Sequence, residues 1–184
     1  MTIEELIKTA HDNAKASGWW DEKRNTDELL MLIVSECGEA LEAHRNGKRA
    51  NLALYERLVA RKNEINDASF FRDHIKDTFE DELADIVIRI ADLAGGLGFA
   101  SLPTRNVIAE SNGNVGAQLF EVVVAISQSK QGHIVETEVS PHAIGDVWSL
   151  TWGIANAHGI DLWRHIELKM KYNLTRPRKH GKAY

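Results

Sequence analysis

Apolar residues recur at intervals of three and four along almost the whole chain, and runs that alternate between apolar and polar residues are scarce. This spacing places apolar side chains on one face of an α-helix, so it predicts a protein built of amphipathic helices. The 184 residues include three prolines, so few positions interrupt such helices, and 43% of the residues are hydrophobic, enough to form a core. We therefore expect a single all-α domain over residues 1–184, folded as an antiparallel helix bundle.

Capping residues and glycines place the predicted helix ends. Thr2 with Glu5 forms a capping box ahead of the first helix, and Asn25 or Thr26 caps a second helix that Gly47 stops. Further helices are predicted at about 50–66, 69–75, 78–97, 115–130, 142–158 and 161–172, and the alternating segment 133–139 is interpreted as a loop or a short extended piece.

Charge is distributed unevenly along the chain. The net charge of the chain is −5, but residues 169–184 hold six Lys or Arg and no acidic residue. Residues 1–168 therefore contain 16 basic and 27 acidic residues, a net charge of about −11. An acidic body disfavours nucleic acid as a partner, whereas a short basic tail suits a small anionic ligand. No apolar run approaches the roughly 18 residues that cross a bilayer, so no membrane partner is expected. Cys37 stands alone and the N-terminus lacks a signal-like apolar core, which predicts a cytoplasmic protein.

Two predicted helices carry acidic pairs at the border of their apolar faces. On a helical wheel, Glu36 and Glu39 lie at the edge of the apolar face of the first helix. Glu82 and Asp85 lie at the same angles from the apolar face of the second helix. One such pair is commonly a solvated helix edge. If the two faces pack antiparallel, however, all four carboxylates converge, and hard divalent cations with oxygen ligands relieve their repulsion. Asp92 and Arg89 either join this cluster or lie on the solvated side of the helix, and for Arg89 the solvated side is preferred.

The residues around these pairs resemble a known family. SECGEALEAHRNGK followed by DELADIVIRIADLAGGLG is similar to the ExxE and ExxD motifs of the MazG-like all-α nucleoside triphosphate pyrophosphohydrolases, a superfamily that includes dimeric dUTPases. GWWDEKRNTDELL and GIDLWRHIELKMKYNLTRPRKHGK resemble the flanking segments, whereas 48–77 and 100–157 depart from the pattern. The resemblance implies hydrolysis of a nucleoside triphosphate to a monophosphate and pyrophosphate. It also implies Mg²⁺, for which Mn²⁺ can substitute, held by Glu36, Glu39, Glu82 and Asp85, and it allows a homo-oligomer.

Candidate roles follow for residues near the motifs. Glu39, with Glu36, is the catalytic candidate that orients or deprotonates the attacking water. The candidate phosphate ligands are Lys171, Asn173, Arg176 and Arg178. We expect the tail that carries them to leave the last helix as an extended segment and to close over the substrate. Trp19 and Trp20 either stack on a base or pack in the core.

The segment between the motifs and the tail contains a candidate repeat. An offset of 61 residues aligns DELADIVIRIADLAGGLGF with HAIGDVWSLTWGIANAHGI and matches Asp85 to Asp146. The chain is then a tandem pseudo-dimer with a degenerate second half at about 115–160, or the match is a coincidence between amphipathic helices. Trp148 and Trp152, four residues apart, are expected in the core or at an interface.

Two other functions remain open at this point. One is a dUTPase-like diphosphatase, and the other is a helical module that binds metal or nucleotide without turnover. No base-reading residue is recognisable, so the preferred base and sugar are open.

Overall fold

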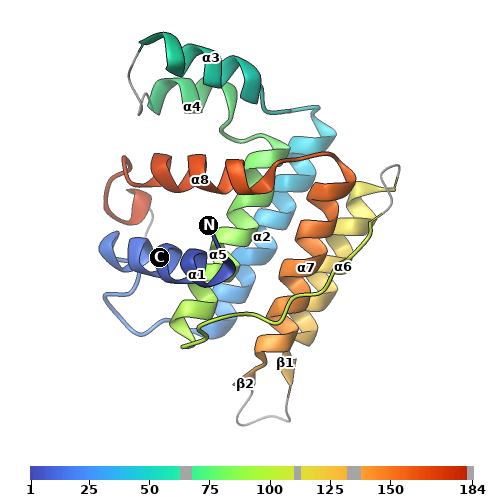
Figure 1. Ribbon diagram of the computed structural model, residues 1–184. Coiled ribbons are helices and arrows are strands. Elements are labelled where there is room, and N and C mark those ends of the chain that lie inside the picture. Colours follow the sequence, from blue (N-terminus) through green and yellow to red (C-terminus); the bar gives the residue numbers. More distant parts are fainter. Residues whose placement is uncertain (63–67, 110–112, 132–137, 182–184) are drawn as a thin grey trace.

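The computed structural model describes residues 1–62, 68–109, 113–131 and 138–181, which fold almost entirely into helices (Figure 1). The elements are α1 (Ile3–Ala16), α2 (Thr26–Arg45), α3 (Leu52–Lys62), α4 (Ala68–His74), α5 (Phe79–Gly96), α6 (Val115–Gln128), β1 (Lys130–Gln131), β2 (Glu138–Val139), α7 (Pro141–Ala157), α8 (Leu162–Asn173) and the 3-10 helix η1 (Arg178–Gly181). The predicted all-α class is confirmed, and the predicted helices lie close to the observed ones, except that residues 63–66 of the helix predicted at about 50–66 lie outside the described residues.

Side-chain caps set the helix starts where the sequence indicates them. The Thr2 hydroxyl accepts a hydrogen bond from the Glu5 amide, and the Glu5 carboxylate accepts one from the Thr2 amide. Asn25 rather than Thr26 caps α2 through its side-chain oxygen. Gly47 follows α2 with a φ of 65°, a conformation that favours glycine, so the helix ends there.

The central helix of the bundle is α5, which packs against α1, α2, α7 and α8. Its apolar side chains, such as Phe79 and Leu83, are fully buried. α2 and α5 are antiparallel: the Phe79 amide at the start of α5 donates to the Lys48 carbonyl beyond the end of α2, and further along Arg89 meets Glu36. Because α6 packs against both α2 and α7, the helices α2, α5, α6 and α7 stand side by side (Figure 1).

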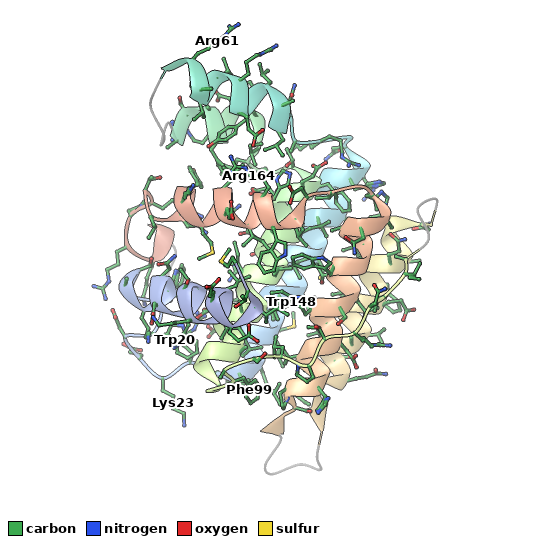
Figure 2. The ribbon with its side chains drawn as sticks, in the orientation of Figure 1. Trp20, Lys23, Arg61, Phe99, Trp148 and Arg164 are labelled. Atoms are coloured by element: carbon green, nitrogen blue, oxygen red, sulfur yellow. The ribbon has the colours of Figure 1, made fainter. Side chains whose placement is uncertain are left out.

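The segment between the two acidic motifs folds into α3 and α4, which pack on each other and against α8. Tyr55 and Phe71 belong to a small apolar cluster there, and the Phe71 ring stacks on Tyr172 of α8 with centroids 4.5 Å apart. Figure 2 shows Arg164 of α8 pointing toward this helix pair, where its Nε donates to Glu56 Oε1 at 3.0 Å. This segment therefore covers the side of α8 that faces away from α1.

A short hairpin joins α6 to α7. Lys130 pairs with Val139, and Gln131 with Glu138, in antiparallel register. Residues 133–137 of the alternating segment lie outside the described residues, and its last two form the extended piece β2. None of the helices in the described ranges combines the length and the apolar character that a bilayer crossing requires.

Candidate metal and substrate site

Carboxylates from α2 and α5 converge where the two helices pack. Glu36 of α2 and Glu82 and Asp85 of α5 each offer an oxygen, and these oxygens lie within 4.8 Å of one another. The i, i+3 spacing puts Glu82 and Asp85 on one side of α5, and the antiparallel packing brings Glu36 opposite them. Glu39 is exposed and lines the adjoining cavity, but it lies outside this close group. The structure thus brings three of the four predicted metal ligands together.

Burial makes this carboxylate group unfavourable without a cation. Glu36 and Glu82 are only 4% and 3% exposed. Burial, and then the charge of Asp85, raises the pKa of Glu82 to about 9. Burial also raises the pKa of Glu36, with Asp85 adding to the shift and Arg89 opposing it. Among the described residues Glu82 makes no close ion pair, and the charge of Lys169 only partly opposes the rise in its pKa, so it is the carboxylate with the greatest need for a cation.

A buried lysine faces the same group from α8. Lys169 Nζ lies 2.7 Å from Asp81 Oδ2 and 2.6 Å from Asp85 Oδ2. Burial alone would lower the pKa of Lys169, but the charges of Asp85 and Asp81 raise it above the ordinary value, so the ammonium form persists. Sequence reasoning missed this residue. Its signal is its place on the face of α8 that buries Leu162 and Ile166, because a lysine on a buried face indicates an acidic partner.

Arg89 also faces the carboxylates, so the expectation of a solvated position was wrong. Its Nε donates to Glu36 Oε1 at 2.5 Å, and its side chain lines the cavity. The helical wheel places Arg89 within about 20° of Glu82, and α2 packs close enough for the guanidinium to reach across. Two side-chain cations, Lys169 and Arg89, therefore contact carboxylates of this site.

These side chains form one wall of a cavity of about 300 Å³, a volume at the lower end of small-molecule sites. α1 contributes Ala10, Asn13 and Ala14, and the loop after α1 contributes Trp19 and Arg24. The remaining polar lining comes from Ser17, Lys76, Asp77, Asp92, Asn173 and Arg176. The cavity thus has an acidic wall and several basic side chains around it, an arrangement that suits an anion bound through a divalent cation.

The predicted phosphate ligands divide into two pairs. Asn173 and Arg176 line the cavity, and Arg176 Nη1 donates to Asn173 Oδ1 at 3.4 Å. Lys171 is exposed on α8, and Arg178 is exposed in η1; neither lines the cavity. Asn173 and Arg176 are therefore the tail residues that the geometry places beside the carboxylates.

The tail itself differs from the extended segment that we predicted. After Pro177 the chain forms η1, Arg178 makes an ion pair with Asp21, and the Lys179 amide donates to the Ser17 carbonyl at 2.9 Å. Proline does end the helical path of α8, as expected, but the chain then turns back onto the end of α1. The tail is already docked beside the cavity.

The two tryptophans at the end of α1 have different environments. Trp19 lines the cavity, and the Arg24 guanidinium lies 5.7 Å from its ring centroid. Trp20, labelled in Figure 2, donates from Nε1 to Asp92 Oδ1 at 2.8 Å. A Cβ placed on Gly96 would lie 2.1 Å from the Trp20 ring, so this ring rests directly on α5. Trp20 therefore packs against the core, and Trp19 is the tryptophan of this pair that lines the cavity.

Comparisons with protein-family models, with curated proteins and with solved structures found no match for this chain. Two buried carboxylates, Glu36 and Glu82, and the half-buried Asp85 offer an oxygen-only donor set, which fits Mg²⁺ or Mn²⁺ better than softer metals.

Proposed function

We propose that this protein is a Mg²⁺-dependent nucleotide pyrophosphohydrolase that cleaves a nucleoside triphosphate to a monophosphate and pyrophosphate. The observation that carries the proposal is Glu82, a buried carboxylate that makes no close ion pair among the described residues, held next to Glu36 and Asp85 beside a ligand-sized cavity. The resemblance of the two acidic motifs to MazG-like enzymes supports the same conclusion.

The donor set fits the metal that the family resemblance implies. Glu36, Glu82 and Asp85 would hold the ion, and Glu39 at the cavity wall would join them through a water or by a rotamer change. When bound, Mg²⁺ would offset the charge of a triphosphate and lower the pKa of a coordinated water. Mn²⁺ has the same oxygen preference and is expected to replace it.

The other lining residues have roles that follow from their chemistry. Asn173 and Arg176 donate hydrogen bonds to phosphate oxygens, for which a guanidinium is well suited. Glu39, exposed to the cavity, orients or deprotonates the attacking water. Trp19 offers a ring face on which a base stacks, and Lys169 holds Asp85 in place from behind.

Pyrophosphate release from a panel of nucleoside triphosphates, measured with and without Mg²⁺, tests the proposal. Glu39→Gln and Glu82→Gln are the informative variants, because neither removes a partner from Lys169 or Arg89. Each should lower kcat/KM at least about a hundredfold while the circular dichroism melt stays cooperative. Glu42→Gln is the matched control: Glu42 is exposed on α2, where it accepts from Asn46 Nδ2, and its loss should leave turnover unchanged.

The outcomes separate the remaining alternatives. Turnover confined to dUTP indicates a dUTPase-like enzyme with the same site. Nucleotide binding without any pyrophosphate indicates a non-catalytic module. Full activity in Glu82→Gln contradicts the assignment of the site.

We also propose that the bundle is of the MazG-like type and contains an internal duplication. α6 packs against α7 as α2 packs against α5, and cross-contacts α2–α6 and α5–α7 join the two pairs, which supports a tandem arrangement. The offset of 61 residues relates α5 to α7. An experimental structure in which the two helix pairs superpose with Asp85 on Asp146 would support the duplication, and a different register would remove it.

A further inference from the structure

A second cavity, of about 230 Å³, lies on the other side of the bundle and shares no lining residue with the first. Its walls are α7, the start of α8, Ile3 at the start of α1, and the segment 104–107 that follows α5. Figure 1 shows this segment, coloured yellow-green, crossing α7 beneath α8. Nothing in the proposed hydrolysis uses this cavity.

Three tryptophans form its aromatic wall. The rings of Trp148 and Trp152 are nearly parallel, 5° apart in plane with centroids separated by 5.5 Å. Trp163 of α8 packs against Trp152 at 4.9 Å and at an angle of 60°. All three line the cavity, but Trp148, labelled in Figure 2, is buried, whereas Trp152 and Trp163 are half-buried. The expected position in the core therefore fits Trp148. Its neighbours Trp152 and Trp163 keep exposed ring surface that a ligand can contact.

The opposite wall is held in a fixed position by α7. The Arg105 amide donates to Ser149 Oγ at 3.0 Å. A Cβ on Gly145 would lie 2.0 Å from the Pro103 carbonyl oxygen, and one on Gly153 would lie 2.9 Å from the Val107 carbonyl oxygen. Glycine at these two places lets the segment lie directly on the helix. The cavity is therefore formed before any ligand arrives, which lowers the entropic cost of binding.

The polar groups of the cavity specify the class of ligand. Asn106 and Asn156 supply carboxamides, each with a donor and an acceptor, and no Asp or Glu is among the residues that line it in the described chain. Its one charged residue, Arg105, has its Nε engaged by Asp146 Oδ1 at 2.6 Å. Without a carboxylate in the lining, a cationic ligand gains no ion pair, and with the guanidinium engaged, an anion gains little. A neutral ring whose edge has both donors and acceptors fits these groups best.

We propose that this cavity binds the base of a nucleoside, or a similar neutral planar nitrogen heterocycle, on the surface of Trp152 and Trp163. The ring stacks on indole, a contact that every base can make, and Asn156 and Asn106 bind its edge. The volume is below the roughly 300 Å³ of drug-sized sites, which suits one mono- or bicyclic ring with its sugar toward solvent. The site requires neither metal nor phosphate, so it is independent of the proposed hydrolysis.

Binding of unphosphorylated nucleosides to the full chain in EDTA tests this inference. Adenosine, guanosine, cytidine, thymidine and uridine are titrated by calorimetry, so that five tryptophans do not confuse the signal. At least one should bind at submillimolar concentration. Trp152→Leu and Asn156→Leu should each weaken it at least about tenfold, whereas Trp152→Phe, which keeps a ring, should change it less than about threefold. Asn156 is exposed, so its variant is expected to fold even if Trp152→Leu does not.

Trp19→Leu is the matched control, because it removes the corresponding ring from the first cavity. Binding that survives Trp19→Leu and fails in Asn156→Leu supports the second cavity. Binding that fails in Trp19→Leu and survives in Asn156→Leu places the base in the first cavity and overturns the proposal. The proposal is also overturned if no nucleoside binds at millimolar concentration. Selective binding of tetramethylammonium would overturn it as well, because it would indicate a cation site instead.

Discussion

Replacing Lys169 with methionine tests the electrostatics of the carboxylate group most directly, because it removes the ammonium and keeps most of the apolar stem. Lys169 is 4% exposed, and Asp81, which it contacts, is fully buried. Asp81 Oδ1 has no hydrogen-bond partner among the described residues, so Lys169 and the Asp77 amide on Oδ2 are its stabilising contacts. Removing one member of a buried pair typically costs about 3 to 5 kcal/mol.

The lower end of that range applies here. Burial already raises the pKa of Asp81, and Lys169 opposes that shift. Without the lysine, Asp81 takes up a proton at neutral pH instead of staying charged in the core, which limits the cost to about 3 kcal/mol. For a chain of this size, each kcal/mol shifts the melting temperature by about 2 to 4 °C. Lys169→Met should therefore melt about 6 to 12 °C below the wild type.

Circular dichroism melts at pH 7 in EDTA measure this shift. Lys171→Met makes the same chemical change at an exposed position of α8 and should cost less than about 0.5 kcal/mol. Asp81→Asn combined with Lys169→Met should recover at least about 1 kcal/mol relative to the sum of the single variants, because the two groups act as a pair. A melting temperature of Lys169→Met within about 2 °C of the wild type would refute the buried pair.

Three further outcomes are expected. In EDTA the free energy of unfolding should fall as pH rises from about 5 to about 9, because folded Glu82 keeps a proton that the unfolded chain has lost. Urea denaturation at several pH values should show that this pH dependence is weaker in Glu82→Gln and unchanged in Glu42→Gln. Mg²⁺ or Mn²⁺ at a hundredfold excess over Kd should stabilise the fold by about 2.7 kcal/mol, reversibly with EDTA, and an indifferent melting curve would favour a site without metal. Deleting 173–184 should lower kcat/KM at least about tenfold, less so in high salt, and an unchanged value would remove the tail from the substrate site.

The helices were predictable because their signals are local. Thr2 with Glu5, Asn25 and Thr78 cap the helices that their own sequence neighbourhood starts, and a capping hydrogen bond spans only two or three residues. The packing of α4 on α8 was not predictable in this way. It depends on the Phe71–Tyr172 stack, a contact between residues about a hundred positions apart that no periodicity relates.

The candidate site shows the same division. The phase of Glu36, Glu82 and Asp85 on their helices followed from the 3.6-residue repeat, and packing of the two apolar faces then brought them together. Lys169 and Asp81 are 88 positions apart in the sequence. The sequence pattern does not predict that α8 packs against α5, and this contact becomes evident only in the folded structure. What the sequence did offer was a lysine on an apolar stripe, which predicts a buried acidic partner without saying which one.

The charges at the site are compatible with the proposed metal ion beside the two protein cations. Glu36, Asp81, Glu82 and Asp85 are four acids, and Lys169 and Arg89 are the two cations that contact them in the described chain. With all six groups ionised the site lacks two positive charges, which is the charge of one divalent ion. Without metal, the proton that the raised pKa of Glu82 retains supplies part of that deficit. If Mg²⁺ binds as proposed, it must displace this proton, so we expect its affinity to rise with pH, while Lys169 and Arg89 hold the acids in place with or without the metal.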